Sequence, residues 1–247
     1  MPFYKIKDKT RSWTGEPIGI LVLDCAYPFV PGNVANATTY PFPVRFHEVR
    51  GATADRLLNQ RDPALLEPFI EGARALEREG VAAITGACGF MALFQQEVAD
   101  AVDVPVFLSS LMQVPFITRT LRKGQEVGII SAKASVLTEQ HLRNVGITED
   151  MPVVLYGMET KEEFYTSVLG QKGTMDTDLI TKEICELGDQ MREEHPGLAA
   201  ILLECSDLPP FAAALNAHTG LPIFDFITMI KHVHSALVPS NYADGHM

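Results

Sequence analysis

The sequence has 247 residues, of which 47% are hydrophobic, a composition typical of a globular protein that folds without disulfides or bound metals. It carries 20 Lys and Arg against 31 Asp and Glu, so its formal net charge is −11. This charge disfavours nucleic acids and anionic membranes as partners. No apolar run approaches the roughly 20 residues that span a bilayer.

The cysteines and the first residues of the chain predict a cytoplasmic protein with free thiols. The four cysteines follow no metal-ligand spacing; they are Cys25, Cys88, Cys185 and Cys205. The opening segment, Met1–Lys9, is charged and lacks the apolar stretch of a secretion signal. Because the sequence also lacks a phosphate-binding glycine motif and an HExxH zinc motif, we expect no cofactor and no metal.

Apolar strand-like runs alternate with helix-like segments along the chain. Strands are predicted at 18–23, 44–49, 81–87, 105–109, 127–131, 152–156 and 198–204, with a further short apolar run at 221–224. Helices are predicted at 64–79, 90–102, 112–123, 160–170 and 177–194, with a last helix that begins near Ile227. The alternation indicates an α/β fold with mainly parallel sheets that are flanked by helices.

A unit of strand, cysteine, helix and strand occurs twice in the chain. Cys88 lies 17 residues before Pro105, and Cys205 lies 17 residues before Pro222. The repeat predicts two pseudo-symmetric lobes with the active site in the cleft between them. We assign residues 17–124 and 225–247 to the first lobe, residues 125–224 to the second, and residues 1–16 to an N-terminal extension.

The repeat can place two thiols on opposite faces of one substrate. Each cysteine stands where a strand meets the amino end of a predicted helix, where the helix dipole and free backbone N–H groups stabilise a thiolate. A thiol with an ordinary pKa of ~8.5 then needs only a modest depression to act as a base near neutral pH. We therefore favour catalysis over packing for Cys88 and Cys205, and packing for Cys185, which lies inside a helix pattern. Cys25 is open to both interpretations.

Three further residues at or beside predicted strand ends are candidate substrate contacts. Asp24 can orient a substrate ammonium or a thiol, or it can cap a turn. The amides around Gly89 can bind an anion, which is compatible with a tight turn there. Ser131 offers donors for a carboxylate, and a plain N-cap explains it at least as well. Glu204 precedes Cys205 by one residue, so strand alternation predicts that its side chain points away from that thiol.

These patterns resemble the aspartate/glutamate racemase superfamily, which includes glutamate, aspartate and hydantoin racemases, maleate isomerases and arylmalonate decarboxylases. The resemblance rests on the two cysteine units and on the strands Ile18–Asp24 and Val127–Ser131. The segment Thr85-Gly86-Ala87-Cys88-Gly89-Phe90-Met91 resembles the branch that contains the algal dimethylsulfoniopropionate lyases. The resemblance implies two α/β lobes, no cofactor, and Cys88 and Cys205 as an opposed acid and base.

The chain departs from glutamate racemases in the residues that follow the cysteines. Those enzymes tend to have Asn-Thr after the first cysteine and Thr-His after the second, where this chain has Gly89-Phe90 and Ser206-Asp207. By position, the resemblance implies that Gly89, Phe90 and Ser206 contact the substrate. Because a polar pair has become a glycine and an aromatic ring, and the histidine is absent, glutamate and aspartate are disfavoured as substrates.

From these patterns we predict a cofactor-independent racemase or isomerase that acts at the carbon alpha to the carboxylate of a small substrate. One thiol would remove a proton and the other would return one to the opposite face. A first alternative is a lyase that cleaves a β-substituted carboxylate such as dimethylsulfoniopropionate by thiolate-initiated elimination. Phe90, Met91 and Phe94 would suit its cationic sulfonium, although their spacing is also that of core residues. A second alternative is a non-catalytic protein that binds a small carboxylate. Apolar positions on the last helix would allow a homodimer or a higher homo-oligomer.

Overall fold

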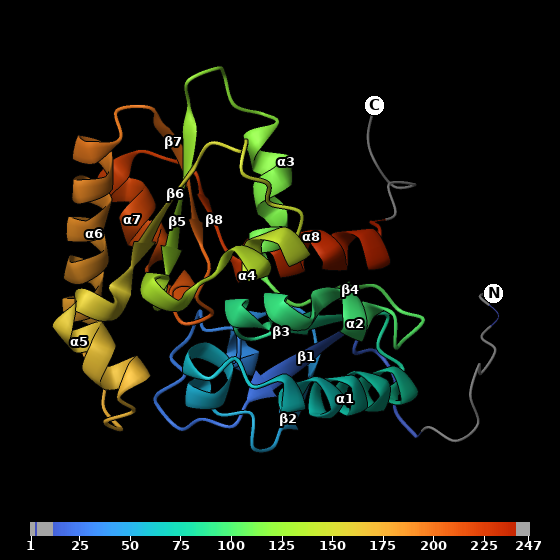
Figure 1. The fold of residues 1–247 in the computed structure, drawn as a ribbon. Helices are drawn as coiled ribbons and strands as arrows, with labels where there is room; N and C mark the ends of the chain where they lie inside the picture. The colour runs from blue at the N-terminus through green and yellow to red at the C-terminus, as the bar shows by residue number, and fades with distance from the viewer. Residues whose placement is uncertain (1–2, 4–11, 241–247) are drawn as a thin grey trace.

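The computed structural model describes residue 3 and residues 12–240, and it contains two four-stranded sheets (Figure 1). The first sheet has the order β2-β1-β3-β4 and consists of β1 (Ile18–Leu23), β2 (Val44–Val49), β3 (Ala83–Gly86) and β4 (Val106–Phe107). The second has the order β6-β5-β7-β8 and consists of β5 (Glu126–Ser131), β6 (Val153–Gly157), β7 (Leu198–Leu203) and β8 (Ile223–Phe224). All pairings within both sheets are parallel. The matching strand orders confirm the predicted α/β fold built from two similar lobes.

The central strand β1 shows why the predicted strands form. It pairs with β2 along its whole length and with β3 over Ile18–Leu21. Ile18 and Ile20 pack into one core cluster, whereas Leu21 packs into another. A strand that is buried on both faces requires apolar residues at successive positions, which is the near-continuous run that the sequence shows.

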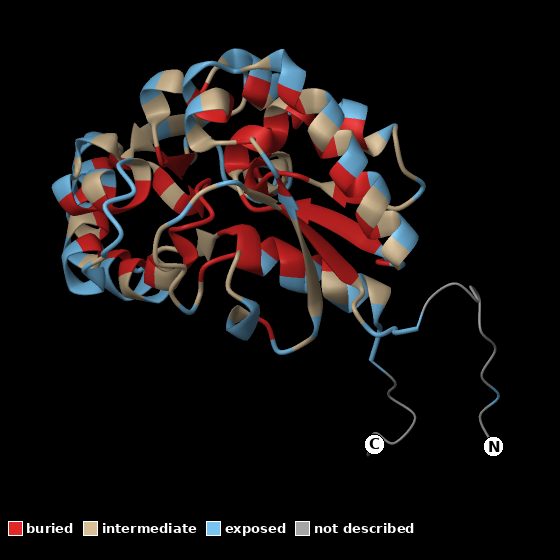
Figure 2. Cartoon of the chain, turned by 90° about the horizontal axis from the view of Figure 1, so that it is seen from below, coloured by how far each residue is buried: buried red, intermediate tan, exposed pale blue. Residues whose placement is uncertain are grey.

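Helices flank both sheets, and their buried faces point toward the strands (Figure 2). They are α1 (Leu66–Glu79), α2 (Gln95–Ala99), α3 (Val114–Thr118), α4 (Glu139–Asn144), α5 (Glu162–Phe164), α6 (Thr177–Glu194), α7 (Ala212–Thr219) and α8 (Phe226–Leu237). The predicted end of α1 is confirmed, because Gly80 follows it with φ of 86°, a left-handed conformation that glycine adopts at little cost.

Three predicted helices are shorter or more broken than the sequence indicates. The segment predicted as a helix over 90–102 is a 3-10 helix, Gly89–Phe94, followed by α2. All residues of this 3-10 helix except Leu93 are buried. Its side chains therefore pack on every side, whereas a surface α-helix buries only one face. The helix predicted over 112–123 ends at Thr118. The one predicted over 160–170 is α5 followed by a single π-helical turn, Tyr165–Leu169.

Helices α3 and α8 cross between the lobes. Helix α8 follows the last strand of the second sheet, but its residues Phe226, Met229 and Ile230 pack with Ile18 and Ile20 of the first sheet. Helix α3 precedes the second sheet and contacts β5 (Figure 1). The division at residues 124 and 225 stays a prediction, and most of the N-terminal extension, as well as residues 241–247, lies outside the described residues.

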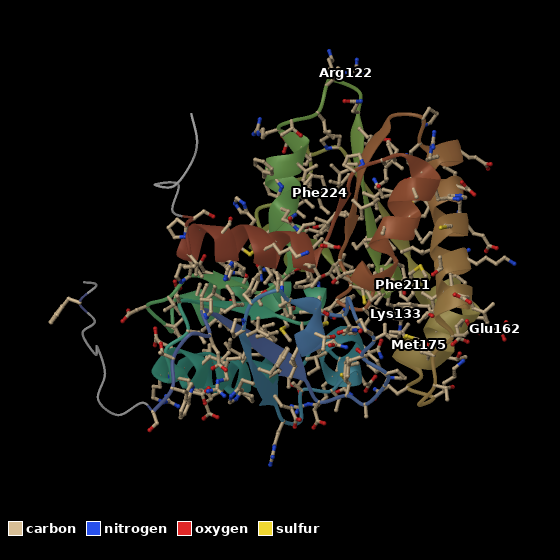
Figure 3. All side chains as sticks on the ribbon, turned by 180° about the vertical axis from the view of Figure 1, so that it is seen from behind. Arg122, Lys133, Glu162, Met175, Phe211 and Phe224 are labelled. Carbon is tan, nitrogen blue, oxygen red and sulfur yellow. The ribbon has the colours of Figure 1, made fainter. Side chains whose placement is uncertain are left out.

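The second sheet directs the carboxyl ends of its strands toward the first lobe. Arg122, on the turn that leads into β5, lies at the far end of this sheet, whereas Lys133, just beyond β5, lies where the two lobes meet (Figure 3). In a parallel sheet the segments after all the strands share this edge, where ligands of α/β folds bind. Within the described part of the chain, no helix has the length and apolar character needed to cross a membrane.

Candidate active site

The two predicted catalytic cysteines line one small cavity between the lobes. Cys88 follows β3, and Cys205 follows β7. Gly89, Phe90 and Ser206 line the same cavity. The space open to water there is ≈ 30 Å³, which is room for about one water molecule. The structure therefore brings together five of the predicted site residues, in a closed arrangement.

The turn after β7, Glu204–Asp207, docks onto the first lobe through polar contacts. The Ser206 hydroxyl donates a hydrogen bond to the carbonyl of Ala87 at 2.7 Å, and the backbone carbonyl of Ser206 accepts one from the amide of Val34 at 3.3 Å. Ser206 is 5% exposed, so this bond is shielded from water. The predicted substrate contact at Ser206 thus serves to join the two cysteine turns as well as to line the cavity.

Asp207 is held by three donors, one of which is the thiol of Cys205. Its Oδ1 accepts from the side-chain amide of Asn33 at 2.5 Å. Its Oδ2 accepts from the hydroxyl of Tyr27 at 3.0 Å and from the thiol of Cys205 at 3.4 Å. Burial raises the pKa of the Asp207 carboxyl, and these donors oppose the rise by favouring the carboxylate. Burial and the nearby Asp207 charge both raise the pKa of Cys205 well above its usual value, which keeps that sulfur protonated.

Glu204, whose side chain was predicted to point away from the Cys205 thiol, contributes a second buried carboxyl group. Its Oε2 accepts a hydrogen bond from the Ser131 hydroxyl at 2.8 Å, whereas its Oε1 has no hydrogen-bond partner. The residue lines the cavity together with Cys88 and Cys205. Strand alternation does not fix the direction of this side chain, because β7 ends at Leu203. The sequence signal for a buried carboxyl group here is Glu204 itself, a charged residue directly after the apolar run Leu198–Leu203.

The carboxyl group of Glu204 fills the space beside Gly89. A Cβ atom at residue 89 would overlap Oε1 and Cδ of Glu204 and would lie 2.5 Å from its backbone carbonyl oxygen. Burial raises the pKa of Glu204 to about 7, and the Asp207 charge acts in the same direction. The Ser131 hydroxyl and the Ala132 amide oppose this rise. Glycine at position 89 is therefore required by a close approach of the second lobe.

The surroundings of Cys88 do not favour a thiolate, contrary to expectation. Burial raises the pKa of this thiol well above its usual value, and the charge on Glu204 raises it further. The backbone N–H of Phe90 hydrogen-bonds to the sulfur and partly opposes the shift. Such amides are visible in the local sequence, whereas the burial and the carboxyl groups of Glu204 and Asp207 come from the fold.

Asp24 and Ser131, the remaining predicted contacts, do not line the cavity. The exposed Asp24 carboxylate accepts from the amide of Gly51 at 2.9 Å and holds a loop. Ser131 is fully buried behind Glu204, so its hydroxyl is committed to that carboxyl group. Phe90 lines the cavity, and its ring meets His141 edge-to-face with centroids 5.2 Å apart. Met91 and Phe94 are core residues.

A second pocket of ≈ 200 Å³ shares a wall with the thiol cavity. Ala87, Ser206 and Tyr27 line both spaces. The remaining lining of the second pocket includes Phe29, Phe46, Cys25 and the carboxylate-bearing Glu48. Burial raises the pKa of Cys25 to about 11, which keeps that thiol neutral. Neither set of lining residues contains Lys or Arg, and no group of three or more His, Cys, Asp or Glu among the described residues is arranged to hold a metal.

Comparison with known proteins places the chain in a family. The family model described as Asp/Glu/Hydantoin racemase matches residues 58–231. The chain belongs to this family. Among curated members, it is 32% identical over 216 residues to a dimethylsulfoniopropionate lyase from Durusdinium sp. clade D, which covers 85% of the chain and 71% of that protein. It is 29% identical over 230 residues to dimethylsulfoniopropionate lyase 3 from Emiliania huxleyi (strain CCMP1516), covering 90% of the chain and 60% of that protein.

Solved structures of racemases and decarboxylases share the fold of this family member. Allantoin racemase from Klebsiella pneumoniae superposes with a TM-score of 0.60 at 16% identity, covering 89% of this chain and 87% of that one. Unliganded arylmalonate decarboxylase superposes with a TM-score of 0.54 at 16% identity, covering 92% and 94%. These likenesses extend over both lobes and concern the fold alone.

Proposed function

We propose that this protein is a lyase that cleaves a β-substituted carboxylate with a cationic leaving group, and that dimethylsulfoniopropionate is its substrate. The proposal goes beyond the family membership, which is equally compatible with the racemase predicted from the sequence. It is supported by the names of the two curated relatives and by the charge and shape of the site. The unequal surroundings of the two thiols are the observation that carries it.

The first support is the charge around the cavity. Glu204 and Asp207 line it, and no cationic side chain does. Such a lining attracts a cation and repels a substrate that carries only negative charge. The adjoining pocket adds the aromatic side chains of Tyr27, Phe29 and Phe46 and the carboxylate of Glu48. Aromatic side chains combined with a carboxylate are a common means of binding onium groups, to which a dimethylsulfonium belongs.

The second support is the difference between the two thiols. Cys205 donates a hydrogen bond to Asp207, an acceptor that Asn33 and Tyr27 hold in place. This arrangement makes Cys205 a persistent hydrogen-bond donor. Cys88 has no such bond to a carboxylate and receives an amide N–H from Phe90. A racemase needs two groups that exchange the roles of acid and base, whereas an elimination needs one base.

The reaction then proceeds with Cys88 as the base. The bound cation favours ionisation of the Cys88 thiol because it offsets the negative charges that raise the pKa of that thiol. The thiolate removes a proton from the carbon alpha to the carboxylate. The electron pair of that C–H bond forms the double bond of acrylate, the C–S bond breaks, and dimethyl sulfide leaves with the electrons of that bond. The Cys205 thiol stays hydrogen-bonded to Asp207 and takes no part in removing the proton.

Incubation with dimethylsulfoniopropionate in deuterated water tests the proposal. Headspace gas chromatography should detect dimethyl sulfide, and proton NMR should show acrylate in equal amount. A parallel panel of α-chiral carboxylates should show neither racemisation nor α-deuteration. Racemisation of a panel member without cleavage of dimethylsulfoniopropionate would instead establish the racemase. That outcome has its own structural support, because Cys88 and Cys205 each receive a backbone N–H from the residue two positions onward.

A further inference from the structure

Glu204 is a buried acid with one oxygen that nothing in the resting site uses. Its exposed fraction is 0%, and Ser131 binds only one of its two carboxyl oxygens. A buried acceptor without a partner destabilises the folded protein. Such a group is uncommon in native structures and calls for an explanation. The position of the free oxygen beside Gly89, in the turn that carries Cys88, suggests what that explanation is.

We propose that the free oxygen of Glu204 accepts the proton of the Cys88 thiol when substrate enters the closed cavity. Glu204 then acts through Cys88 and not on the substrate itself. The inference rests on the proposed elimination, since it concerns how the base of that reaction is generated.

The alternatives for receiving this proton are few. Asp207 already accepts three hydrogen bonds, from Asn33, Tyr27 and Cys205. Bulk water is a poor acceptor here, because the space open to water at the two thiols is only ≈ 30 Å³. Glu204 has both a vacant oxygen and electrostatic contact with the Cys88 thiol.

The acidity of Glu204 suits this task. With a pKa of about 7, the group is partly ionised at neutral pH and can take up a proton or release one. The titratable groups that act on it or are acted on by it are Cys88, Cys205 and Asp207, and its polar neighbours are the Ser131 hydroxyl and the Ala132 amide. Since none of these is a fixed positive charge, the entering substrate cation is the charge that favours the ionised thiol.

The proton balance of the cycle closes with Glu204 included. The resting site holds a Cys88 thiol and a Glu204 carboxylate. Substrate binding moves the thiol proton to Glu204, and the thiolate then takes the α-proton as dimethyl sulfide leaves. The site now holds a Cys88 thiol and a protonated Glu204. Opening for product release lets Glu204 return its proton to water, which accounts for the one proton that the reaction liberates.

The Glu204→Gln variant separates this role from its alternatives by two measurements that should move in opposite directions. In the free enzyme the variant removes a negative charge that raises the pKa of Cys88. Iodoacetamide should therefore alkylate Cys88 several-fold faster at pH 8, as followed by mass spectrometry. Turnover of dimethylsulfoniopropionate should nevertheless fall about 100-fold, the usual effect of losing one acid-base group. The acidic limb of the pH profile, with its midpoint near pH 7, should disappear.

Other outcomes overturn the proposal. Parallel loss of alkylation and turnover would mean that Glu204 only supports the structure, and parallel gain would mean that it only repels the thiolate. The matched control is Glu126→Gln, at the opposite end of the second sheet, which should leave both measurements unchanged. Glu126 pairs with His195 at 3.1 Å and does not line the cavity.

A measurement on the unmodified protein keeps the inference testable if the variant does not fold or the proposed activity is absent. Isotope-edited infrared spectroscopy can follow the carboxyl band of Glu204 across pH 5 to 9 without substrate. Titration near pH 7 supports the inference even if dimethylsulfoniopropionate is not cleaved, in which case the proposed function alone fails. A Glu204 that stays fully ionised at pH 5 overturns the inference whether or not the lyase activity is found.

Discussion

Replacement of Glu204 by Gln should change how the stability of the protein depends on pH. Burial raises the pKa of this carboxyl from 4.5 to about 7. Since each pKa unit corresponds to about 1.4 kcal/mol, the buried charge destabilises the folded protein by about 3 kcal/mol once Glu204 is fully ionised. Gln has nearly the same shape, can keep the hydrogen bond from Ser131, and does not titrate in this range.

The sign of the effect follows from the protons bound in each state. Between pH 4.5 and about 7 the folded protein keeps the Glu204 proton, whereas the unfolded chain has released it. The unfolded state therefore binds fewer protons, and the contribution of Glu204 to stability falls as pH rises through this window. This contribution stops changing once the pH is well above the pKa of Glu204 in the folded protein. The free energy of unfolding of the variant, relative to wild type, should thus rise by about 3 kcal/mol from pH 4.5 to pH 8.

Urea denaturation at pH 5, 6, 7 and 8, followed by circular dichroism, measures this difference. The test is how the difference in the free energy of unfolding changes with pH. A difference that is the same at every pH would instead reflect how the amide of the Glu204→Gln variant packs, so it is not part of the test. The difference between Glu126→Gln and wild type should not follow the same curve, since the Glu126 side chain is partly exposed to water and pairs with His195. A pH-independent difference for Glu204→Gln, or one that is largest at acid pH, would refute the reasoning about this carboxyl group.

Further substitutions test the two thiols and the lobe contacts. Cys88→Ser should lower lyase turnover by about 10³-fold, because a serine hydroxyl is too weak a base, whereas Cys205→Ser keeps a donor and should lose only about tenfold; equal losses would contradict the assigned roles. Asp207→Asn should lower the pKa of Cys205 and speed its alkylation by iodoacetamide at pH 8, as read by mass spectrometry, and an unchanged rate would contradict the charge effect. Ser206→Ala removes the donor to the Ala87 carbonyl and should cost about 1–3 kcal/mol in urea denaturation. A loss within experimental error would show that this bond does not hold the lobes together.

Local patterns in the sequence were sufficient to predict the scaffold. The apolar run Ile18–Leu23 became β1 with those bounds, because a strand that is buried on both faces has no other composition available. The equal spacing of Cys88 and Cys205 from their following strands predicted that the two turns meet, and both line one cavity. These features depend on short stretches of chain whose structure is set mainly by their own residues.

The electrostatics of the site could not be predicted in the same way. The Cys88 thiol was expected to be acidic because its sequence neighbours offer amides, but the group that raises its pKa most after burial is Glu204, which is 116 positions away in the sequence and in the other lobe. The same contact explains Gly89, whose neighbour across the lobes is invisible in the local sequence. The continuous α-helix predicted over 90–102 is a 3-10 helix followed by α2 for a related reason, since its first turn packs on every side and not on one face. Contacts between distant segments decide all three features.

Under the proposed function, the turn Glu204–Asp207 supplies the reacting groups, and its hydrogen bonds also hold the two lobes together. A substrate much larger than the ≈ 30 Å³ open to water at the thiols would enter by parting the lobes, which would break the hydrogen bond between Ser206 and Ala87 and detach Asp207 from Tyr27 and Asn33. The proposed acid-base site would then be assembled on each closure and dismantled on each opening. One lobe of such a protein could be replaced by that of a relative only if the other lobe were replaced with it, because residues of both lobes form the site.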